Sequence, residues 1–340
     1  MKKKILIALA IVAAILIIVA GIGAKSIFGS NTQNNKQASI TIPIGATFEQ
    51  VLDTLRSHDI LRNENSFKAV VKAMRFKTMR PGHYKIEPNT SNFELVRQLR
   101  VGQHYPVKFA FNNIRTIDQL VSKVDGKFFF EAKELTLLLK DSTYLHQYGF
   151  TPATVPAMFI PNSYDIFYDI PAEKFVEKMH ENYQKFWTTE RKEQAQSIGF
   201  TPIEVATLAS IVEEENFRPA EKAIIAGLYI NRLHKDMLLQ ADPTVKFALG
   251  DFARKRILNA DLQIDSPYNT YKYKGLPPGP IRIPEGSTID SVLHYAHHDY
   301  LYMCAKEDLS GYHNFTSSAA VHAQNAAHYR AALNRQNIRR

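Results

Sequence analysis

Residues 5–24 form the stretch that most limits how this chain can fold. None of its 20 side chains is charged, and Lys2, Lys3 and Lys4 stand directly before it. A helix of this length spans about 30 Å, the thickness of the hydrocarbon core of a bilayer. Because positive residues stay on the cytoplasmic side, we expect residues 1–4 to be a cytoplasmic tail and 5–24 a single-pass transmembrane helix. The rest of the chain is then extracytoplasmic and anchored in the cell inner membrane.

A cleaved signal peptide is the alternative interpretation of the same stretch. Gly21, Ile22 and Gly23 supply a small-x-small site that a signal peptidase could cut. The apolar segment is longer than the ~7 to 15 residues usual in a signal peptide, which favours an anchor that is kept. Residues 25–38, KSIFGSNTQNNKQA, are polar and rich in turn-forming residues, which predicts a linker.

Composition limits the classes of protein that remain. The chain has 340 residues of which 45% are hydrophobic, enough for one or two domains with their own cores. Its single cysteine, Cys304, cannot form an internal disulfide, and no Cys or His set has structural-zinc spacing. We predict no metal and no cofactor. The net charge of +9 is spread along the chain without a basic, aromatic-rich helix, which argues against nucleic acid and suits a polyanionic envelope.

Residues 39–106 are predicted to form a small α/β module that ends near Pro106. SITI and HYKI have the pattern of strands, and helices are expected near 47–57, 64–75 and 91–100. Thr47 with Gln50, Ser91 with Glu94, and Thr116 with Gln119 have the spacing of helix capping boxes. IRIPEGSTIDSVL (281–293) repeats the pattern of ITIPIGATFEQVL (40–52), either as a duplication or as a common strand-to-helix junction.

The larger region, 107–340, begins with the strand-like VKFAF and continues with mostly helical patterns, such as Phe175–Trp187 and Glu221–Leu233. One helix has a clear start, because Thr201, Pro202 and Glu204 supply an N-cap, a first-turn proline and a capping-box acid. That helix contains the segment LASIVEEEN (208–216), in which an apolar run leads directly into three glutamates.

A helical wheel separates these three acids. The buried stripe comprises Val205, Leu208, Ala209 and Val212. Glu213 lies at its edge beside small side chains, Glu214 points to the exposed side, and Glu215 lies between apolar residues. An acid near apolar neighbours, at a helix carboxyl end and next to like charges resists ionisation, which suits a general acid. The wheel favours Glu213 for this role, with Glu215 as a secondary acid, and the alternative is a solvated helix end.

Four motifs follow the acids along the chain: LYINRL (228–233), LLQADPTVKFALG (238–250), SPYNTYKYKGLPPGPI (266–281) and YHNF (312–315). Together with the acidic Ser-Ile-Val-Glu helix, and in this order, they resemble the endolytic murein transglycosylases, the YceG-like family of membrane-anchored enzymes that cut peptidoglycan glycan strands. The resemblance covers nearly the whole chain. It implies an α+β fold with a membrane helix, a LysM-like module at 39–106 and a larger, mostly helical α+β catalytic domain at 107–340.

The resemblance also implies a reaction and a site. The reaction is cleavage of the MurNAc-β-1,4-GlcNAc bond of nascent strands, leaving 1,6-anhydro-MurNAc ends and terminating strand elongation, with peptidoglycan synthases as candidate partners. It assigns the catalytic role to the first glutamate of the run, Glu213. The chain departs from the family pattern at Pro156, Ala157, Asn162 and Ala323, which concerns one wall of the cleft.

Five residues of these motifs are candidates for binding sugar: Gln240, Asp242, Tyr268, Asn269 and Tyr271. Tyrosines in loops are also frequent packing residues. Asp242 is the one motif acid that could act as the second carboxylate of a muramidase, which would be a hydrolase. The proline after Asp242 favours instead a turn in which its carboxylate accepts backbone hydrogen bonds.

Other functional classes have less support. The usual serine-hydrolase, penicillin-binding, zincin and P-loop signatures are missing from the sequence. His294, His297 and His298, with Asp299 beside them, have a spacing that could hold a metal on a helix, although such histidines are more often surface or core residues. A non-enzymatic, anchored wall-binding scaffold remains the second class of function.

Overall fold

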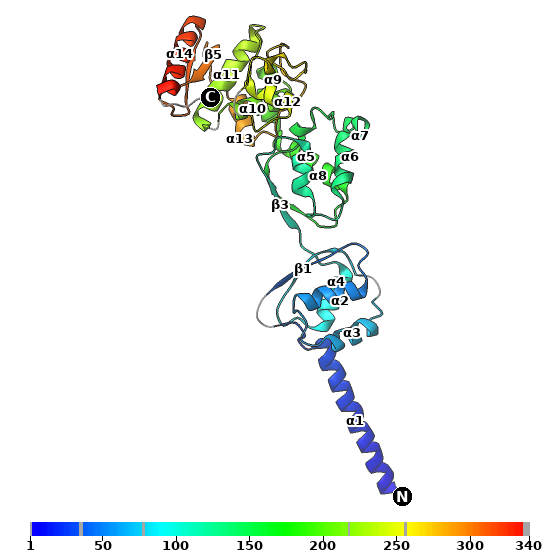
Figure 1. Cartoon of the computed structure of the whole chain (residues 1–340). Helices are drawn as coiled ribbons and strands as arrows, with labels where there is room; N and C mark the ends of the chain where they lie inside the picture. Colours follow the sequence, from blue (N-terminus) through cyan, green and yellow to red (C-terminus); the bar gives the residue numbers. More distant parts are fainter. Residues whose placement is uncertain (1, 34–36, 77–78, 217, 255–256, 336–340) are drawn as a thin grey trace. The chain divides into compact units, whose positions relative to one another are not determined.

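The computed structural model of the chain describes residues 2–33, 37–76, 79–216, 218–254 and 257–335 (Figure 1). The chain forms two compact units. The first comprises Met1–Phe109, Gly126–Glu131 and Tyr164–Pro171, and the second comprises Ala110–Asp125, Ala132–Ser163 and Ala172–Arg340. The chain therefore returns twice to the first unit after leaving it.

The first unit opens with helix α1 (Lys2–Phe28), which is long and apolar enough to cross a membrane. This helix continues four residues beyond the apolar stretch, and Ile27 packs against the core of the module that follows. The predicted linker is therefore wrong for residues 25–33, which complete α1 and then bond to the module. Ser30 pairs with Ser91, and Thr32 pairs with Leu61.

The module consists of two strands and three helices. In chain order they are β1 (Ala38–Ile42), α2 (Phe48–Ser57), α3 (Glu64–Ala73), β2 (Gly82–Ile86) and α4 (Asn92–Val101). The strands pair antiparallel, with Ala38 opposite Ile86 and Ile42 opposite Gly82. Leu52, Phe67 and Tyr84 are fully buried between the sheet and the helices. The predicted strands and helices of this region are confirmed.

Capping explains where two helices of the module and the helix after Thr116 begin. Thr47 with Gln50 and Ser91 with Glu94 form complete capping boxes, as predicted. Thr116 caps its helix through the backbone N–H of Gln119, but the Gln119 side chain accepts from Arg115 instead of returning to Thr116. That third box is therefore only half formed.

The second unit is mostly helical. Strands β3 and β4 have residues assigned to each of the two units. In chain order the elements are β3 (Val107–Phe111), α5 (Ile117–Val124), α6 (Ala132–Lys140), α7 (Ser142–His146), a 3₁₀ turn at Val155–Met158, β4 (Asn162–Ile166), α8 (Ala172–Phe186), α9 (Thr189–Ser197), α10 (Pro202–Glu215), α11 (Pro219–His234), α12 (Asp242–Leu249), a 3₁₀ turn at Asp261–Gln263, α13 (Gly286–Leu293), β5 (Tyr302–Ala305), β6 (His313–Thr316) and α14 (Ala319–Arg335). Strands β3 and β4 pair with each other, and so do β5 and β6.

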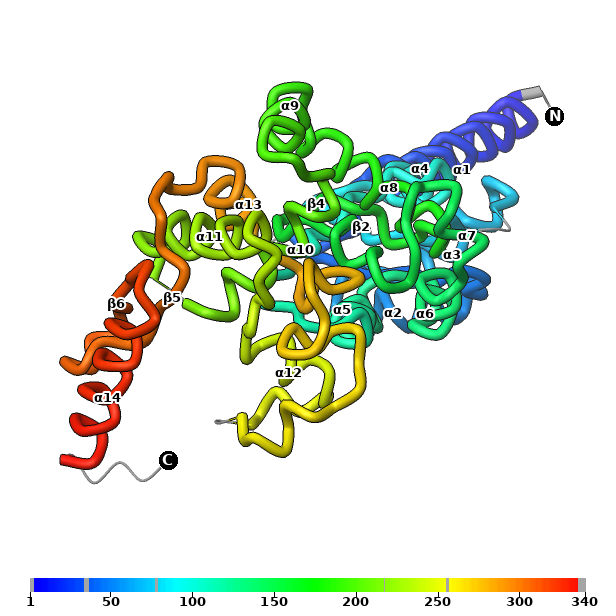
Figure 2. Tube along the Cα trace, turned by 90° about the horizontal axis from the view of Figure 1, so that it is seen from above, coloured from blue at the N-terminus to red at the C-terminus, as the bar shows by residue number. Residues whose placement is uncertain are grey.

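Helix α10 lies at the centre of the second unit, with α11, α12 and α13 around it (Figure 2). It begins as predicted, with a Thr201–Glu204 capping box and Pro202 in its first turn. Every residue from Val205 to Glu213 is buried. A wheel with one buried stripe and one solvent face therefore does not describe this helix.

The second copy of the repeated sequence pattern folds differently from the first. Residues 281–285 are not a strand, and α13 begins at Gly286 with Glu285 as its N-cap. Ile281 and Ile283 are buried and bond through their N–H groups to Ser210 and to the Ile114 carbonyl. The copy is thus a local junction and not a duplicated unit.

The segment after α13 also differs from the expectation. The helix ends at Leu293, so His294, His297 and His298 do not share a helical face. Within the described ranges, no group of three or more His, Cys, Asp or Glu side chains lies close enough together to hold a metal ion. Gly227 of α11 accommodates this segment, because a Cβ there would lie 2.3 Å from the Ala296 carbonyl oxygen.

Candidate functional site

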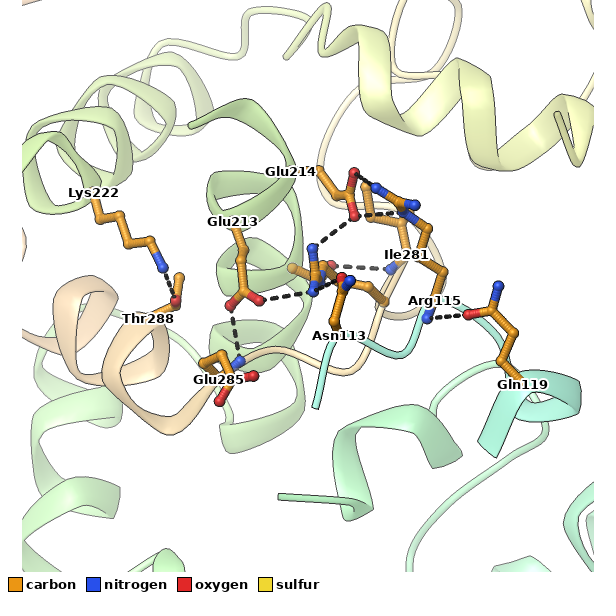
Figure 3. Close-up of polar contacts among 11 residues, drawn as sticks. Asn113, Arg115, Gln119, Glu213, Glu214, Lys222, Ile281, Glu285 and Thr288 are labelled. Carbon is orange, nitrogen blue, oxygen red and sulfur yellow. Dashed lines mark hydrogen bonds and ion pairs between the residues drawn. The ribbon is translucent and has the colours of Figure 1, made fainter. Parts of the chain in front are cut away.

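The three glutamates at the end of α10 lie in two different environments. Glu213 and Glu214 contact arginines, on the side of the helix where the segment 281–285 passes (Figure 3). Glu215 contacts α11 and lines a pocket. The carboxyl end of α10 therefore places two acids against arginines and a third acid against a pocket.

Glu213 is held in a buried ion pair. Its Oε1 lies 3.1 Å from Nη2 of Arg282, and its Oε2 accepts a 2.8 Å hydrogen bond from the backbone N–H of Glu285. Glu213 is 4% exposed and Arg282 is 2% exposed. Burial together with the Glu213 charge raises the pKa of the neighbouring Glu285. Glu213 is not among the residues that line the pocket containing Glu215.

Glu214 was expected to be exposed, and that expectation is wrong. Only 14% of its side chain is exposed, and Arg115 reaches it through Nε and Nη2 at 2.8 and 3.1 Å. Arg282 donates to the same carboxylate through Nη1 at 2.8 Å. The wheel failed because the segments of Arg115 and Arg282 cover the face that it assigned to solvent.

These contacts form one charge network, in which two arginines face two carboxylates. Arg282 also donates to the Asn113 side chain at 2.9 Å. Ser210, one turn before Glu213, accepts the N–H of Ile281 at 3.0 Å. The network therefore ties α10 to the segments at 113–115 and 281–285, and each charge has an opposite partner.

Glu215 lies beside a pocket of about 300 Å³. Its Oε1 accepts a 2.6 Å hydrogen bond from the hydroxyl of Tyr229 on α11. The residues that line this pocket are Glu215, Leu228, Tyr229, Arg232, Leu239, Gln240, Asp242, Tyr271, Met303 and His322. The pocket thus gathers Glu215 with Gln240, Asp242 and Tyr271, three of the residues that the sequence motifs singled out.

The pKa of Glu215 is raised to about 7. Burial is the main cause, and the nearby charge of Asp242 acts in the same direction, while the hydrogen bond from Tyr229 lowers the pKa. A carboxyl group with this pKa can donate a proton near neutral pH and accept one back. This is the property required of a group that serves as both acid and base.

Asp242 lies at the exposed rim of the pocket. It is the first residue of α12, and its Oδ1 accepts a 2.6 Å hydrogen bond from the Tyr271 hydroxyl. The predicted turn is therefore a helix start, and the carboxylate accepts from the Tyr271 phenol where backbone donors were expected. Burial, followed by the Asp242 contact, raises the pKa of Tyr271.

Gln240 has an unusual backbone. Its φ is +52°, a left-handed conformation that non-glycine residues seldom adopt, and its N–H donates to the Thr270 carbonyl at 3.0 Å. Arg232 braces this stretch by donating to the carbonyls of Leu239 and Leu238 at 2.8 and 3.2 Å, and to that of Leu301 at 2.6 Å. The pocket wall at Gln240 is therefore built in a fixed and strained shape.

Tyr268 and Asn269 lie outside the pocket lining. The Tyr268 ring packs against Phe247, with ring centroids 4.7 Å apart. Asn269 is fully buried, and its amide donates to the Leu262 and Ile264 carbonyls while accepting the Tyr271 N–H. In these positions the two residues shape the loop that presents Tyr271 and do not face the pocket.

Helix α14 closes another side of the pocket through His322. Its ring stacks on Tyr302 with centroids 5.4 Å apart, and no group among the described residues forms a hydrogen bond with its Nδ1. Three of the four positions at which the sequence departs from the family pattern lie elsewhere: Pro156 and Ala157 are in the 3₁₀ turn at Val155–Met158, and Asn162 begins β4. The fourth, Ala323, follows His322 on α14.

Sequence reasoning missed several residues of this region. Tyr229 and Arg232 stand in the LYINRL motif, which was noted for its resemblance but given no role. The sequence signal that could have identified them is a tyrosine and an arginine one turn apart on a helix that closely follows the acidic helix end. Arg115 and Arg282 carried no such signal, because Arg115 is 99 residues and Arg282 is 68 residues from Glu214.

The chain is similar to known proteins over most of its length. The family model described as YceG-like matches residues 40–328. A protein named endolytic murein transglycosylase from Bacillus subtilis (strain 168) is 29% identical over 290 residues, covering 79% of each chain. One of the same name from Streptococcus pneumoniae (strain D39) is 25% identical and covers 91% of this chain, although this chain spans only 61% of that relative. The crystal structure of a YceG-like protein from Listeria monocytogenes matches 85% of this chain and 98% of its own, with a TM-score of 0.57 and 25% identity.

Proposed function

The chain belongs to the YceG-like family, and on that premise we propose that it is an endolytic murein transglycosylase, a lyase that cleaves peptidoglycan glycan strands. The observation that carries the proposal is the pocket in which Glu215, with a pKa of about 7, meets Tyr229, Gln240, Asp242 and Tyr271. A pocket lined by polar groups, with one acid whose pKa is raised, can bind a sugar and protonate the oxygen of its glycosidic bond.

We assign the acid-base role to Glu215. It is the one glutamate of the three that lines this pocket of about 300 Å³. Among the described residues no arginine forms an ion pair with it, although Arg232 lines the same pocket and its charge lowers the pKa of Glu215. Glu213, which the sequence favoured, is paired with Arg282 and lies 4% exposed. We propose that Glu213 and Glu214 hold the end of α10 in place, so that Glu215 is presented at a fixed position.

The proposed reaction needs one carboxyl group in two states. Protonated Glu215 gives its proton to the glycosidic oxygen, the bond between that oxygen and C1 of MurNAc breaks, and GlcNAc leaves with a new C4 hydroxyl. The C6 hydroxyl of the same MurNAc then attacks C1, and the Glu215 carboxylate takes the hydroxyl proton. The product end is a 1,6-anhydro sugar, no water is consumed, and Glu215 is protonated again.

Neighbouring residues support these steps in the proposal. The hydroxyl of Tyr229 holds the Glu215 carboxylate at 2.6 Å and restricts its orientation. The Asp242 carboxylate lines the same pocket, where it could stabilise the positive charge that develops at C1. Tyr271 holds Asp242 in turn at 2.6 Å.

A muramidase is the second candidate, and the position of Asp242 favours it. Asp242 and Glu215 line one pocket, as the two carboxylates of a hydrolase do. The two reactions differ in the fate of water. The test is to incubate the protein with purified glycan strands and to weigh the products: transglycosylase products are lighter by one water, whereas hydrolysis leaves reducing muramic ends.

We further propose that α1 anchors the chain in the cell inner membrane, with the amino terminus in the cytoplasm and the enzymatic unit outside. The length and hydropathy of α1 and the lysines before it support this orientation. Cleavage close to the membrane would act on nascent strands, terminate their elongation and bring peptidoglycan synthases within reach. The module at 39–106 is the candidate glycan-binding, LysM-like part. An anchored protein keeps Met1 and resists a high-salt wash of membranes, whereas a mature amino terminus near Ala24 would contradict anchoring.

A further inference from the structure

The junction between α1 and the module fixes how far the module stands from the end of the apolar stretch. The side chain of Asn92, in the first turn of α4, donates to the Ser26 carbonyl at 2.8 Å. Ile27 packs against the module's core, and the Phe28 and Phe93 rings lie 5.5 Å apart. Contact with the module thus begins two residues after Ala24, where the uncharged stretch ends.

The chain after α1 makes the junction stiffer. Asn31 is 4% exposed, and its amide donates to the Asn63 carbonyl and to the Asn92 side chain at 2.9 and 2.7 Å. The backbone of Asn31 in turn accepts the N–H of Arg62 at 2.8 Å. These buried hydrogen bonds join the residues after α1 to the starts of α3 and α4, so the module is held rigidly to the helix.

Bilayer dimensions then place the module's nearest surface. Residues 5–24 fill about 30 Å of hydrocarbon, and the headgroup layer adds only about 5 to 7 Å on each side. Two further residues of helix rise about 3 Å, which is less than that layer is thick. With α1 anchored as proposed, these lengths would place the part of the module beside the end of α1 within the headgroup layer.

The side chains in this position suit a lipid surface. Phe28 is 65% exposed, and the side chains of Lys25 and Arg62 are exposed as well. Arg62 donates to the Asn89 side chain at 2.8 Å, and Ser30 reaches the same oxygen, which keeps this arginine next to the end of α1. Aromatic rings and cations are the side chains that membrane–water interfaces favour.

We propose that Lys25, Phe28, Arg62 and Phe93 form a membrane-facing cluster, which seats the module on the phospholipid headgroups. The inference rests on the proposed membrane anchoring by α1. As a consequence, the distance between the module and the bilayer is fixed, and no flexible linker separates the two.

The test uses the full-length chain in vesicles of phosphatidylethanolamine and phosphatidylglycerol. Cys304 is the one cysteine, so Cys304→Ser gives a background in which single cysteines carry an environment-sensitive fluorophore. The labelled variants are Ala14→Cys at the middle of the apolar stretch, Phe93→Cys in the cluster, and Val101→Cys as a matched control. Val101 is 58% exposed at the other end of α4, about 13 Å along the helix from Asn92.

Nitroxides on the headgroups should quench the Phe93→Cys label several-fold more than the Val101→Cys label, and acyl-chain nitroxides should quench the Ala14→Cys label. A flexible Gly-Ser insertion of about ten residues between Ala24 and Lys25, before the first residue that contacts the module, should weaken the Phe93→Cys quenching and leave that of Ala14→Cys unchanged. Equal, weak quenching at Phe93→Cys and Val101→Cys, with Ala14→Cys still quenched, would overturn the cluster alone. Loss of quenching at Ala14→Cys would overturn the anchoring as well.

Discussion

The hydroxyl of Tyr229 donates to the Glu215 carboxylate at 2.6 Å and joins the end of α10 to the middle of α11. Tyr229 is 2% exposed, so this bond is made away from bulk water at the base of the pocket. It opposes the effect of burial on the pKa of Glu215. Its strength therefore bears on both the position and the proton affinity of the proposed acid.

Glu215→Gln should reduce glycan cleavage by about 10² to 10⁴, because an amide can accept the Tyr229 hydrogen bond but cannot give a proton to the leaving oxygen. The melting temperature should change little. Rates on purified glycan and a thermal melt of the same preparation measure both quantities. A Glu215→Gln variant with normal rates would remove Glu215 from the chemistry.

Glu213→Gln should act chiefly on stability. Removing one charge of a buried pair leaves Arg282 partly uncompensated, which costs about 3 kcal/mol or more and lowers the melting temperature by roughly 6 °C or more. Cleavage should persist below that temperature. In a double-mutant cycle, Glu213→Gln with Arg282→Met should cost less than the sum of the two single changes. A stable but inactive Glu213→Gln protein would return the acid role to Glu213.

Tyr229→Phe should move the pH dependence. The hydrogen bond lowers the pKa of Glu215, so its loss raises that pKa and keeps the group protonated to higher pH. The alkaline limb of the kcat/KM profile should shift upward, with a smaller rate loss than in Glu215→Gln. A rate loss without any shift of the limb would mean that the hydroxyl only packs.

The unmodified protein should lose kcat/KM as pH rises through about 7, since Glu215 must begin the reaction protonated. The Asp242 charge raises the pKa of Glu215, so Asp242→Asn should move this limb to lower pH. Its products should still be lighter by one water. If Asp242→Asn is as inactive as Glu215→Gln, two essential carboxylates would favour the muramidase.

Gln240→Gly and Gln240→Val separate the backbone of the pocket wall from its side chain. Glycine adopts the φ of +52° at no steric cost, whereas a β-branched residue there is strained. The valine variant should therefore have a lower melting temperature and lower activity than the glycine variant. Equal behaviour of the two would show that the left-handed backbone conformation at Gln240 does not limit stability or activity.

Helix starts and other local structure could be predicted from the sequence where interactions between residues close in the chain determine them. The Thr201–Glu204, Thr47–Gln50 and Ser91–Glu94 boxes each join residues three apart, so their formation depends on little else. The helices and strands of the module were predicted for the same reason. The repeated pattern at 281–293 failed because a strand needs a partner, and that segment lies against α10 and the Ile114 carbonyl instead.

The sequence by itself determined three of the polar residues that line the pocket of the candidate site, because the motifs with Gln240, Asp242 and Tyr271 were recognisable in order. Only the tertiary structure decided which glutamate they meet. Consecutive residues of a helix point about 100° apart, so the choice depends on what covers each face of α10. Arg115 and Arg282 arrive from distant parts of the chain to neutralise two of the acids, and α11 brings Tyr229 to the third. The spacing within the acidic run contains no information about those three partners.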